Sequence, residues 1–190
     1  TLFSTYFLCL FARMSGKYKY VKGEKVFRAN ALFAGMACAV LIFVSGFRQG
    51  IGDTGTYRNL FEKVPASFFG FLRHPTIKAD SGFYAIVAFI KQLISPDSQK
   101  VLLCMAIVTI GLIFITYYKN TDMIEMAVFL FITSGCYLVT MNGVRQYLAS
   151  AILFFCFPMI YKKQWKFYLP IVLLCSTIHQ SALIFLLLYF

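Results

Sequence analysis

Charged residues are scarce in this sequence, and acidic residues are the scarcest of them. Charged side chains make up 13% of the 190 residues and hydrophobic ones 60%, and the mean hydropathy is +0.75. A soluble domain is nearer half apolar and a quarter charged. The chain therefore has too little polar surface to cover a water-soluble globule, and its composition indicates a membrane protein.

The few charges are strongly unbalanced. Only 7 acidic residues stand against 18 Lys and Arg, which gives a net charge of +11. These basic residues lie in short segments between apolar runs rather than on one face, so we expect no nucleic-acid partner. The excess is typical of cytoplasmic loops, which collect Lys and Arg and face anionic lipids. Membrane lipids are therefore expected partners.

Signatures of nucleotide, nucleophile and metal chemistry are also missing. The sequence contains no P-loop, no G-x-S-x-G and no D-x-D motif. Its 2 His and scattered acids show no familiar metal-ligand spacing, and its 6 cysteines form no C-x-x-C pair. We expect no metal, no cofactor and free buried thiols.

Apolar segments dominate what is present. A bilayer core of about 30 Å needs roughly 20 apolar residues in a helix, and continuous rather than alternating runs favour helices. The segments are 1–12, 29–47, 83–94, 101–118, 124–141, 144–161 and 168–190. The sequence predicts an all-α, polytopic transmembrane helical bundle that forms one domain over residues 1–190, with about six spans. We expect truncation at both ends, because the chain begins and ends inside apolar runs.

Segment 83–94 is too short to span comfortably and contains Lys91, which favours an interfacial or re-entrant helix. If it spans, the basic residues divide into 8 inside and 9 outside. If it does not, 10 lie inside, Arg145 alone lies in the short outer loops, and 7 lie in 48–100. The positive-inside rule favours the second threading, which makes 48–82 an extracytoplasmic loop on the same side as the turn 141–147.

Polar residues mark three places along the apolar chain. In the first, Arg48 ends an apolar run, glycines permit a tight turn, and Asp53-Thr54 can cap a helix from about Thr56 to Val64. A capped interfacial helix with a snorkelling arginine is the alternative interpretation. The spacing alone does not choose between this and a binding site.

The second place is the start of segment 144–161, where Asn142, Arg145 and Gln146 stand together. An arginine at a helix N-terminus on the outer side opposes both the helix dipole and the positive-inside trend. With no acid close in sequence, Arg145 requires a distant carboxylate or a phosphate, unless it is an interfacial anchor.

The third place is His179, which the segment boundaries put near the middle of the last span. Polar residues at membrane depth are candidates for a functional site. A neutral His that bonds across helices is the alternative.

These places form a pattern. They read R-x-x-x-G-D-T-x-x-Y (Arg48, Gly52, Asp53, Thr54, Tyr57), N-x-x-R-Q (Asn142, Arg145, Gln146) and H-x-S-A (His179, Ser181, Ala182). In this order and membrane context, residues 40–190 resemble the EpsG family of bacterial exopolysaccharide proteins, which is related to the Wzy-type polysaccharide polymerases. A Glu-Pro-Gly-like element of such proteins reads Asp80-Ser81-Gly82 here.

The resemblance implies a multi-pass membrane glycosyltransferase of the bacterial plasma (inner) membrane. Such an enzyme polymerises polyprenyl-diphosphate-linked oligosaccharide repeat units into exopolysaccharide, capsule or O-antigen at the outer face. Its partners are this lipid-linked oligosaccharide and, as candidates, other polysaccharide-assembly proteins. No nucleotide is needed, because the energy lies in the lipid diphosphate.

The resemblance also implies roles for individual residues. Arg48 and Arg145 are the candidate ligands of the diphosphate, and the remaining candidates for substrate binding are Thr54, Tyr57, Asn142 and Gln146. The base that deprotonates the acceptor hydroxyl is Asp53, Asp80 or His179, and the sequence does not choose among them.

Other functions remain open from the sequence. A transporter or flippase for lipid-linked sugars would use the same arginines without chemistry, although no internal repeat typical of transporters is visible. A membrane acyltransferase that modifies polysaccharide would use His179. A non-catalytic assembly subunit is the fourth possibility.

Overall fold

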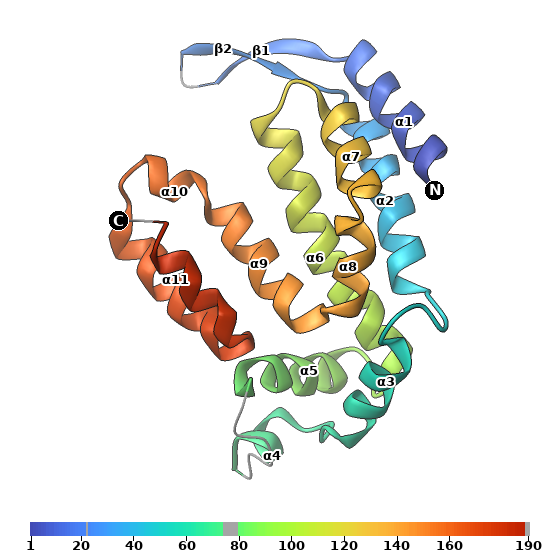
Figure 1. Cartoon of the computed structure of the whole chain (residues 1–190), viewed down its shortest axis with the longest axis vertical. Helices are drawn as coiled ribbons and strands as arrows, with labels where there is room; N and C mark the ends of the chain where they lie inside the picture. The colour runs from blue at the N-terminus through green and yellow to red at the C-terminus, as the bar shows by residue number, and fades with distance from the viewer. Residues whose placement is uncertain (22, 74–79, 189–190) are drawn as a thin grey trace.

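The structure is a computed structural model that describes residues 1–21, 23–73 and 80–188, and it is mainly helical (Figure 1). The expected all-α class is confirmed, with one unpredicted antiparallel hairpin added to it. The elements are α1 (Leu2–Met14), β1 (Lys17–Val21), β2 (Glu24–Arg28), α2 (Ala31–Gly46), α3 (Thr54–Lys63), α4 (Phe68–Arg73), α5 (Ser81–Leu93), α6 (Ser98–Asn120), α7 (Ile124–Thr133), α8 (Cys136–Asn142), α9 (Val144–Cys156), α10 (Pro158–Tyr161), α11 (Trp165–Ile178) and the 3₁₀ helix η1 (Gln180–Leu186).

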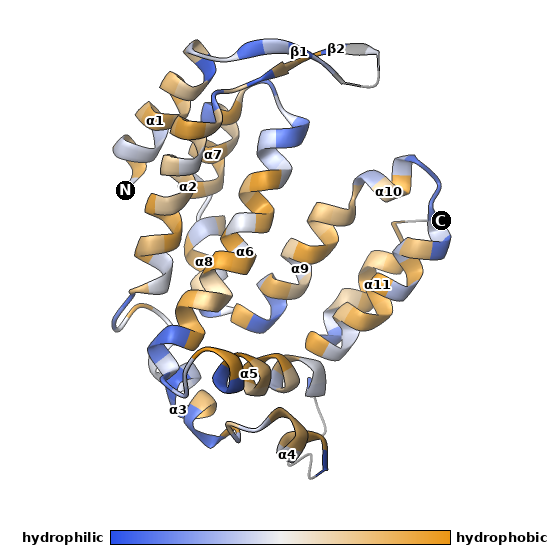
Figure 2. Cartoon of the chain, turned by 180° about the vertical axis from the view of Figure 1, so that it is seen from behind, coloured by the Kyte–Doolittle hydropathy of each residue, from blue (hydrophilic) through white to orange (hydrophobic). Residues whose placement is uncertain are grey.

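Side-chain caps determine where two long apolar helices begin. The Asn30 side chain accepts a hydrogen bond from the Leu32 amide at 3.0 Å and starts α2. The Asp97 carboxylate accepts one from the Gln99 amide at 2.9 Å and starts α6. Each cap satisfies an amide that has no partner within its helix. Figure 2 shows how apolar the helices are between their ends.

The expected number of six spans is not confirmed. Within the described ranges, two helices are long and apolar enough to cross a membrane, namely α6 and the continuous stretch Val144–Tyr161. The pair α7–α8 would count as a third span, but it is bent by 57° at Ser134-Gly135, where Gly135 has a φ of 81°. The apolar helices α1, α2, α5 and α11 are each shorter than 18 residues.

The hairpin and the α3–α5 segment lie at opposite ends of the molecule (Figure 1). At the hairpin end, an Arg28 guanidinium nitrogen donates to the Lys119 carbonyl oxygen at 2.7 Å. At the other end, the Gln99 side chain donates to the carbonyl oxygen of Gly46, which joins the end of α2 to the start of α6. The chain thus enters and leaves the stretch 47–97 at one end, as in the threading where segment 83–94 does not cross.

Helix α5 lies across the ends of α6 and α9 in Figure 1 rather than alongside them. Its 13 residues reach only about 20 Å at 1.5 Å per residue. Lys91 is buried, and its ammonium group donates to the carbonyl oxygens of Phe61 and Val64 at 2.8 and 2.7 Å. These carbonyls lie at the C-terminal end of α3, where the helix dipole favours a cation. Lys91 therefore fixes α5 to α3, and the placement fits an interfacial helix.

The predicted last span, 168–190, is wrong as a single helix. Helix α11 ends at Ile178, His179 is extended with φ −156° and ψ 126°, and η1 folds back against α11 and α9. The apolar pattern continues through the reversal, so hydropathy does not reveal it. His179 consequently lies at the tip of a helical hairpin and not in the middle of a span.

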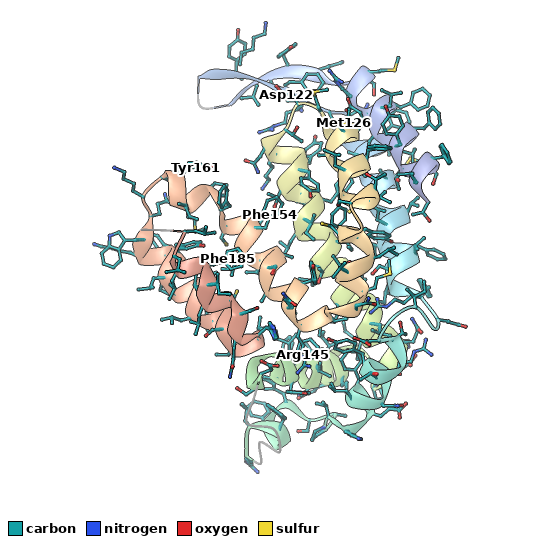
Figure 3. All side chains as sticks on the ribbon, viewed as in Figure 1. Asp122, Met126, Arg145, Phe154, Tyr161 and Phe185 are labelled. Carbon is teal, nitrogen blue, oxygen red and sulfur yellow. The ribbon has the colours of Figure 1, made fainter. Side chains whose placement is uncertain are left out.

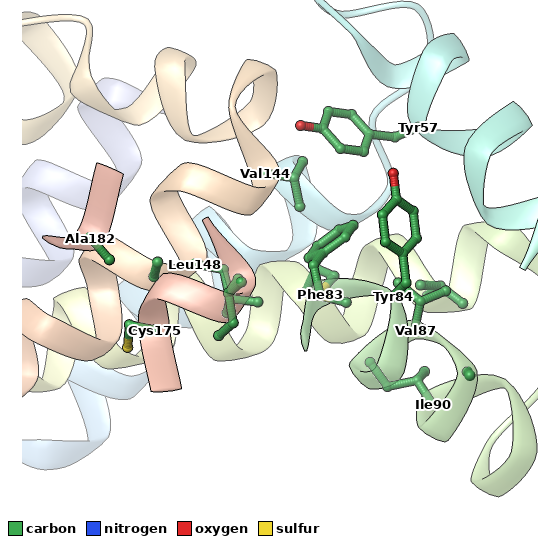
Figure 4. Packing of buried hydrophobic residues seen from close by; sticks show 14 of the residues in the cluster. Tyr57, Phe83, Tyr84, Val87, Ile90, Val144, Leu148, Cys175 and Ala182 are labelled. Carbon is green, nitrogen blue, oxygen red and sulfur yellow. The ribbon is translucent and has the colours of Figure 1, made fainter. Parts of the chain in front are cut away.

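Two buried clusters hold the helices together. One joins α3, α5, α9, α11 and η1 through side chains such as Tyr57, Phe83 and Leu148 (Figure 4). The other joins α1, α2, α7 and α8 through side chains such as Leu41 and Val128. Helices α6 and α9 contribute to both clusters, so they connect the two halves and set the position of the site described next.

Candidate functional site

Three segments that are far apart in sequence meet at the α5 end of the molecule. They are the residue before α5, the first turn of α9 and the tip of the α11–η1 hairpin. A guanidinium nitrogen of Arg145 lies 2.8 Å from Asp80 Oδ2, and His179 Nδ1 lies 3.8 Å from Asp80 Oδ1. The structure thus brings together three of the residues that the sequence singled out.

Arg145 forms the cationic part of this cluster. Its side chain is 32% exposed, and it follows Val144 in the first turn of α9, which has no side-chain cap (Figure 3). The hydroxyl of Tyr57 lies beside it, and Tyr84 is close. Figure 4 shows the hydroxyl end of Tyr57 next to Val144, and Tyr84 beside Phe83 on α5. A partly exposed guanidinium attracts anions through its charge, and an uncapped helix N-terminus attracts them through its backbone amides.

Asp80 is held in an unusual conformation. Its φ of 54° and ψ of 34° are left-handed, which is uncommon outside glycine. It occupies the N-cap position of α5, yet its carboxylate makes no capping hydrogen bond and turns to Arg145 and His179 instead. Nearby, a Cβ on Gly82 would lie 2.1 Å from Thr177 Oγ1 and 3.0 Å from its backbone carbonyl carbon. Glycine is therefore required for α5 to approach the end of α11.

His179 completes the cluster from the hairpin tip. Its side chain is 32% exposed, but Nδ1 is buried and has no hydrogen-bond partner. A buried ring nitrogen without a partner costs free energy, and such atoms in a native site require an explanation. The separation of 3.8 Å from Asp80 is too long for a hydrogen bond.

Arg48 lies at the same end but in different surroundings. It is 4% exposed and donates to the Ser45 carbonyl at 2.6 Å, to Thr54 Oγ1 at 3.1 Å and to the Met141 carbonyl at 3.2 Å. Burial lowers its pKa from the ordinary value. The cavity beside it measures about 10 Å³, which is room for about one water molecule. Arg48 is thus not placed to bind a diphosphate in this structure.

The rest of the first motif mostly supports this junction. Gly52 has a φ of 54°, and a Cβ there would lie 1.5 Å from Asn142 Oδ1, so the loop packs directly on the end of α8. Thr54 is buried and donates to the Ile51 carbonyl. Asp53 stands at the predicted start of α3 but is exposed and makes no side-chain cap, and Gln146 is also exposed.

Sequence reasoning missed several partners. The backbone acceptor of Met141, the packing of Gly82 on Thr177, and the position of Tyr84 beside Arg145 carry no local motif. The glycine in Asp80-Ser81-Gly82 was the only visible signal. In the described ranges, no group of three or more His, Cys, Asp or Glu could hold a metal ion.

Two adjoining apolar hollows lie between α6 and α9. The inner one measures about 270 Å³, and its lining includes Tyr147, Ser150 and Phe185. The outer one measures about 440 Å³ and includes Tyr161. Both are lined by Tyr117 and Phe154, so they adjoin each other, and we call the two together the apolar groove. Figure 3 labels Phe154, Tyr161 and Phe185 among its side chains. Tyr147 follows Arg145 by two positions on α9, so the two side chains leave the helix on different faces.

Apolar helices with a charged, hydrogen-bonding cluster at one end define a helical membrane protein with a polar site at its border. The chain belongs to the EpsG family, which matches residues 31–190, from α2 onward. No curated protein and no solved structure matches the chain. Membership makes this a membrane protein related to polysaccharide biosynthesis, in a family that is linked to exopolysaccharide polymerisation.

Proposed function

We propose that this protein is a glycosyltransferase that polymerises polyprenyl-diphosphate-linked oligosaccharide repeat units into exopolysaccharide, capsule or O-antigen. The reaction takes place at the outer face of the bacterial plasma membrane, where the α3–α5 end lies. The protein crosses this membrane several times. The observation that carries the proposal is the convergence of Arg145, Asp80 and His179 in one partly exposed cluster of an EpsG-family protein.

The leaving group of this reaction needs a cation. When the glycan leaves its lipid carrier, negative charge develops on the diphosphate, and a preorganised guanidinium stabilises it. Arg145 combines partial exposure with the N-terminus of α9. We assign the diphosphate to Arg145, assisted by Tyr57, and leave Arg48 to the helix junction.

The acceptor sugar needs hydrogen-bonding groups and a base. Asn142 and Gln146 are exposed on either side of Arg145 in sequence and offer amide groups to sugar hydroxyls. Asp80 pairs with this guanidinium and faces His179, whereas Asp53 is exposed at the start of α3. The base therefore belongs to the Asp80–His179 pair.

The apolar part of the substrate also has a fitting surface. The groove formed by the two hollows is lined mainly by aromatic and aliphatic side chains, and α9 contributes both to this lining and, at its first turn, Arg145. We assign the isoprenoid chain to this groove, with its diphosphate at the start of α9. This arrangement requires the lipid to enter from the side of the bundle.

The test measures polymer formation by the full-length protein after substitution of Arg145 or of a control arginine at the same end. Arg145→Ala should lower polymer formation at least about 100-fold, the cost of losing one preorganised oxyanion contact, while Arg145→Lys retains part of it. Arg73→Ala, an exposed arginine of α4, serves as the control and should leave polymer length unchanged. Protein amounts are matched by immunoblot.

The same strains separate polymerisation from transport. If single repeat units still reach the outer face in Arg145→Ala while long chains vanish, the chemistry is lost and transport is not. If the units stop arriving, the protein is a transporter. Wild-type chain length in Arg145→Ala at normal protein level contradicts the proposed site.

A further inference from the structure

The cluster contains one carboxylate for two partners. Asp80 Oδ2 is paired with Arg145 at 2.8 Å, and Oδ1 faces His179 Nδ1 at 3.8 Å, beyond hydrogen-bonding distance. The Asp80 side chain is only 11% exposed, so water satisfies little of it. In this structure Asp80 is paired with Arg145 and makes no hydrogen bond to His179.

One ring nitrogen of His179 lacks a hydrogen-bond partner. Nδ1 has no partner and is buried, although a third of the side chain remains exposed. A neutral imidazole carries its proton on one nitrogen, and the hydrogen bond at that nitrogen fixes the tautomer. A carboxylate at Nδ1 would place the proton there and leave the Nε2 lone pair available as a base.

The backbone keeps Asp80 between the two partners. Its left-handed conformation is of the strained kind that concentrates at functional sites, and the carboxylate forgoes the cap of α5. The contact of Gly82 with Thr177 fixes the start of α5 beside the end of α11, two residues from His179. The Asp80 carboxylate therefore lies within 4 Å of both Arg145 and His179.

We propose that Asp80 is a positioning residue that exchanges partners when the lipid diphosphate binds, so that His179 becomes the base only in the loaded site. The inference rests on the proposed function and deepens it. The diphosphate takes over Arg145, and its negative charge repels the carboxylate that held this arginine. Asp80 then accepts a hydrogen bond from Nδ1 of His179, which pairs the buried nitrogen.

The step that follows balances in atoms and charge. The acceptor hydroxyl oxygen forms a bond to the anomeric carbon of the donor glycan, and its proton passes to Nε2 of His179. The bond from the anomeric carbon to the diphosphate oxygen breaks, and its electron pair stays on the polyprenyl diphosphate held by Arg145. Asp80 stabilises the imidazolium, as a carboxylate does behind a catalytic histidine.

The exchange has a kinetic signature in full-length protein reconstituted with a synthetic lipid-linked repeat unit. Asp80→Asn should lower kcat about 100-fold, the usual contribution of a general base, and change KM for the donor by less than about threefold, because Arg145 remains. His179→Gln should lower kcat similarly, and the double variant should lose little more, because residues that act as a unit are non-additive. Glu62→Gln, an exposed acid of α3, is the control.

A spectroscopic readout covers the case in which Asp80→Asn fails to fold. In protein with ¹⁵N-labelled histidine, adding inorganic pyrophosphate should shift the His179 signal, assigned by its loss in His179→Gln, toward the Nδ1–H tautomer. The shift should be absent in Arg145→Gln. A tautomer that ignores pyrophosphate in the parent protein overturns the exchange.

The kinetic outcomes also separate this inference from the proposed function. If Asp80→Asn keeps kcat within about threefold, or if the losses of the two single variants multiply, the exchange is wrong while polymerisation stands. If Arg145, Asp80 and His179 variants all form polymer normally, the proposed site itself is wrong.

Discussion

Arg48 and Arg145 stand at the same end of the molecule, and the sequence suggested the same role for both. Their surroundings are opposite. Arg48 is 4% exposed and bonded to neutral oxygens of Ser45, Thr54 and Met141, whereas the Arg145 side chain is 32% exposed and paired with Asp80. The donors of Arg48 are bonded within the protein, whereas the partly exposed guanidinium of Arg145 is accessible to a ligand.

The neutral partners of Arg48 explain how its charge is tolerated without an acid. Ser45 and Met141 lie in the last turns of α2 and α8, where carbonyl oxygens lack partners within the helix and the dipole is negative. The guanidinium thus joins two helix ends and the start of α3. Arg145 lies at the opposite kind of helix end, where the dipole favours an anion.

Replacing each arginine in turn with methionine should give the largest difference between the two roles. We expect Arg48→Met to lower the free energy of unfolding by about 3 kcal/mol, because several buried acceptors lose a charged donor. Arg145→Met should change it by less than about 1 kcal/mol, since that pair is partly exposed, while abolishing polymer formation. Denaturant unfolding in detergent measures the first effect and polymer length the second. Equal losses of stability would contradict the comparison.

The comparison also shows what the sequence could predict. Apolar runs and the distribution of Lys and Arg predicted a helical protein and put the 48–82 loop on the same side as the 141–147 turn. They could not divide the roles of Arg48 and Arg145, because the decisive partner of Arg48 is a backbone carbonyl 93 residues away. A sequence motif identifies side chains, whereas every residue has a backbone carbonyl, so the motif does not show which carbonyl accepts the hydrogen bond.

The sequence also did not predict where the chain reverses direction within an apolar segment. Nothing in Ser176–Phe185 is a Pro or Gly, yet α11 stops at Ile178 and the chain returns as η1. Packing of η1 on α11 and α9 outweighs the local preference for one helix. The bend at Ser134-Gly135 had a visible glycine and was predictable in principle.

A smaller effect is expected where α5 meets α11. Gly82→Ala places a Cβ 2.1 Å from Thr177 Oγ1, so the helices must separate at a cost of about 1–3 kcal/mol, as for overpacking elsewhere. Because Asp80 and His179 lie on either side of this contact, polymer formation should fall about tenfold. Gly55→Ala is the matched control, since no atom beyond its own helical turn and its chain neighbours lies within 4 Å of its Cβ position.

The two glycine variants are read by polymer length at matched protein level. An unchanged length in Gly82→Ala would show that the Asp80–His179 spacing tolerates displacement. A loss in Gly55→Ala of similar size would mean that the α3–α5 end as a whole, and not the contact with Thr177, is sensitive.

The smallest effect is expected in the apolar groove, away from both arginines. Ser150→Trp fills part of the hollow of about 270 Å³ between α6 and α9. If the isoprenoid chain lies there, KM for the lipid-linked donor should rise about threefold to tenfold, with kcat unchanged, because the chain contributes apolar burial rather than chemistry. Ile107→Trp, on an exposed position of α6 that does not line either hollow, should leave KM unchanged. A similar KM in both tryptophan variants would mean that the isoprenoid chain does not lie in the apolar groove.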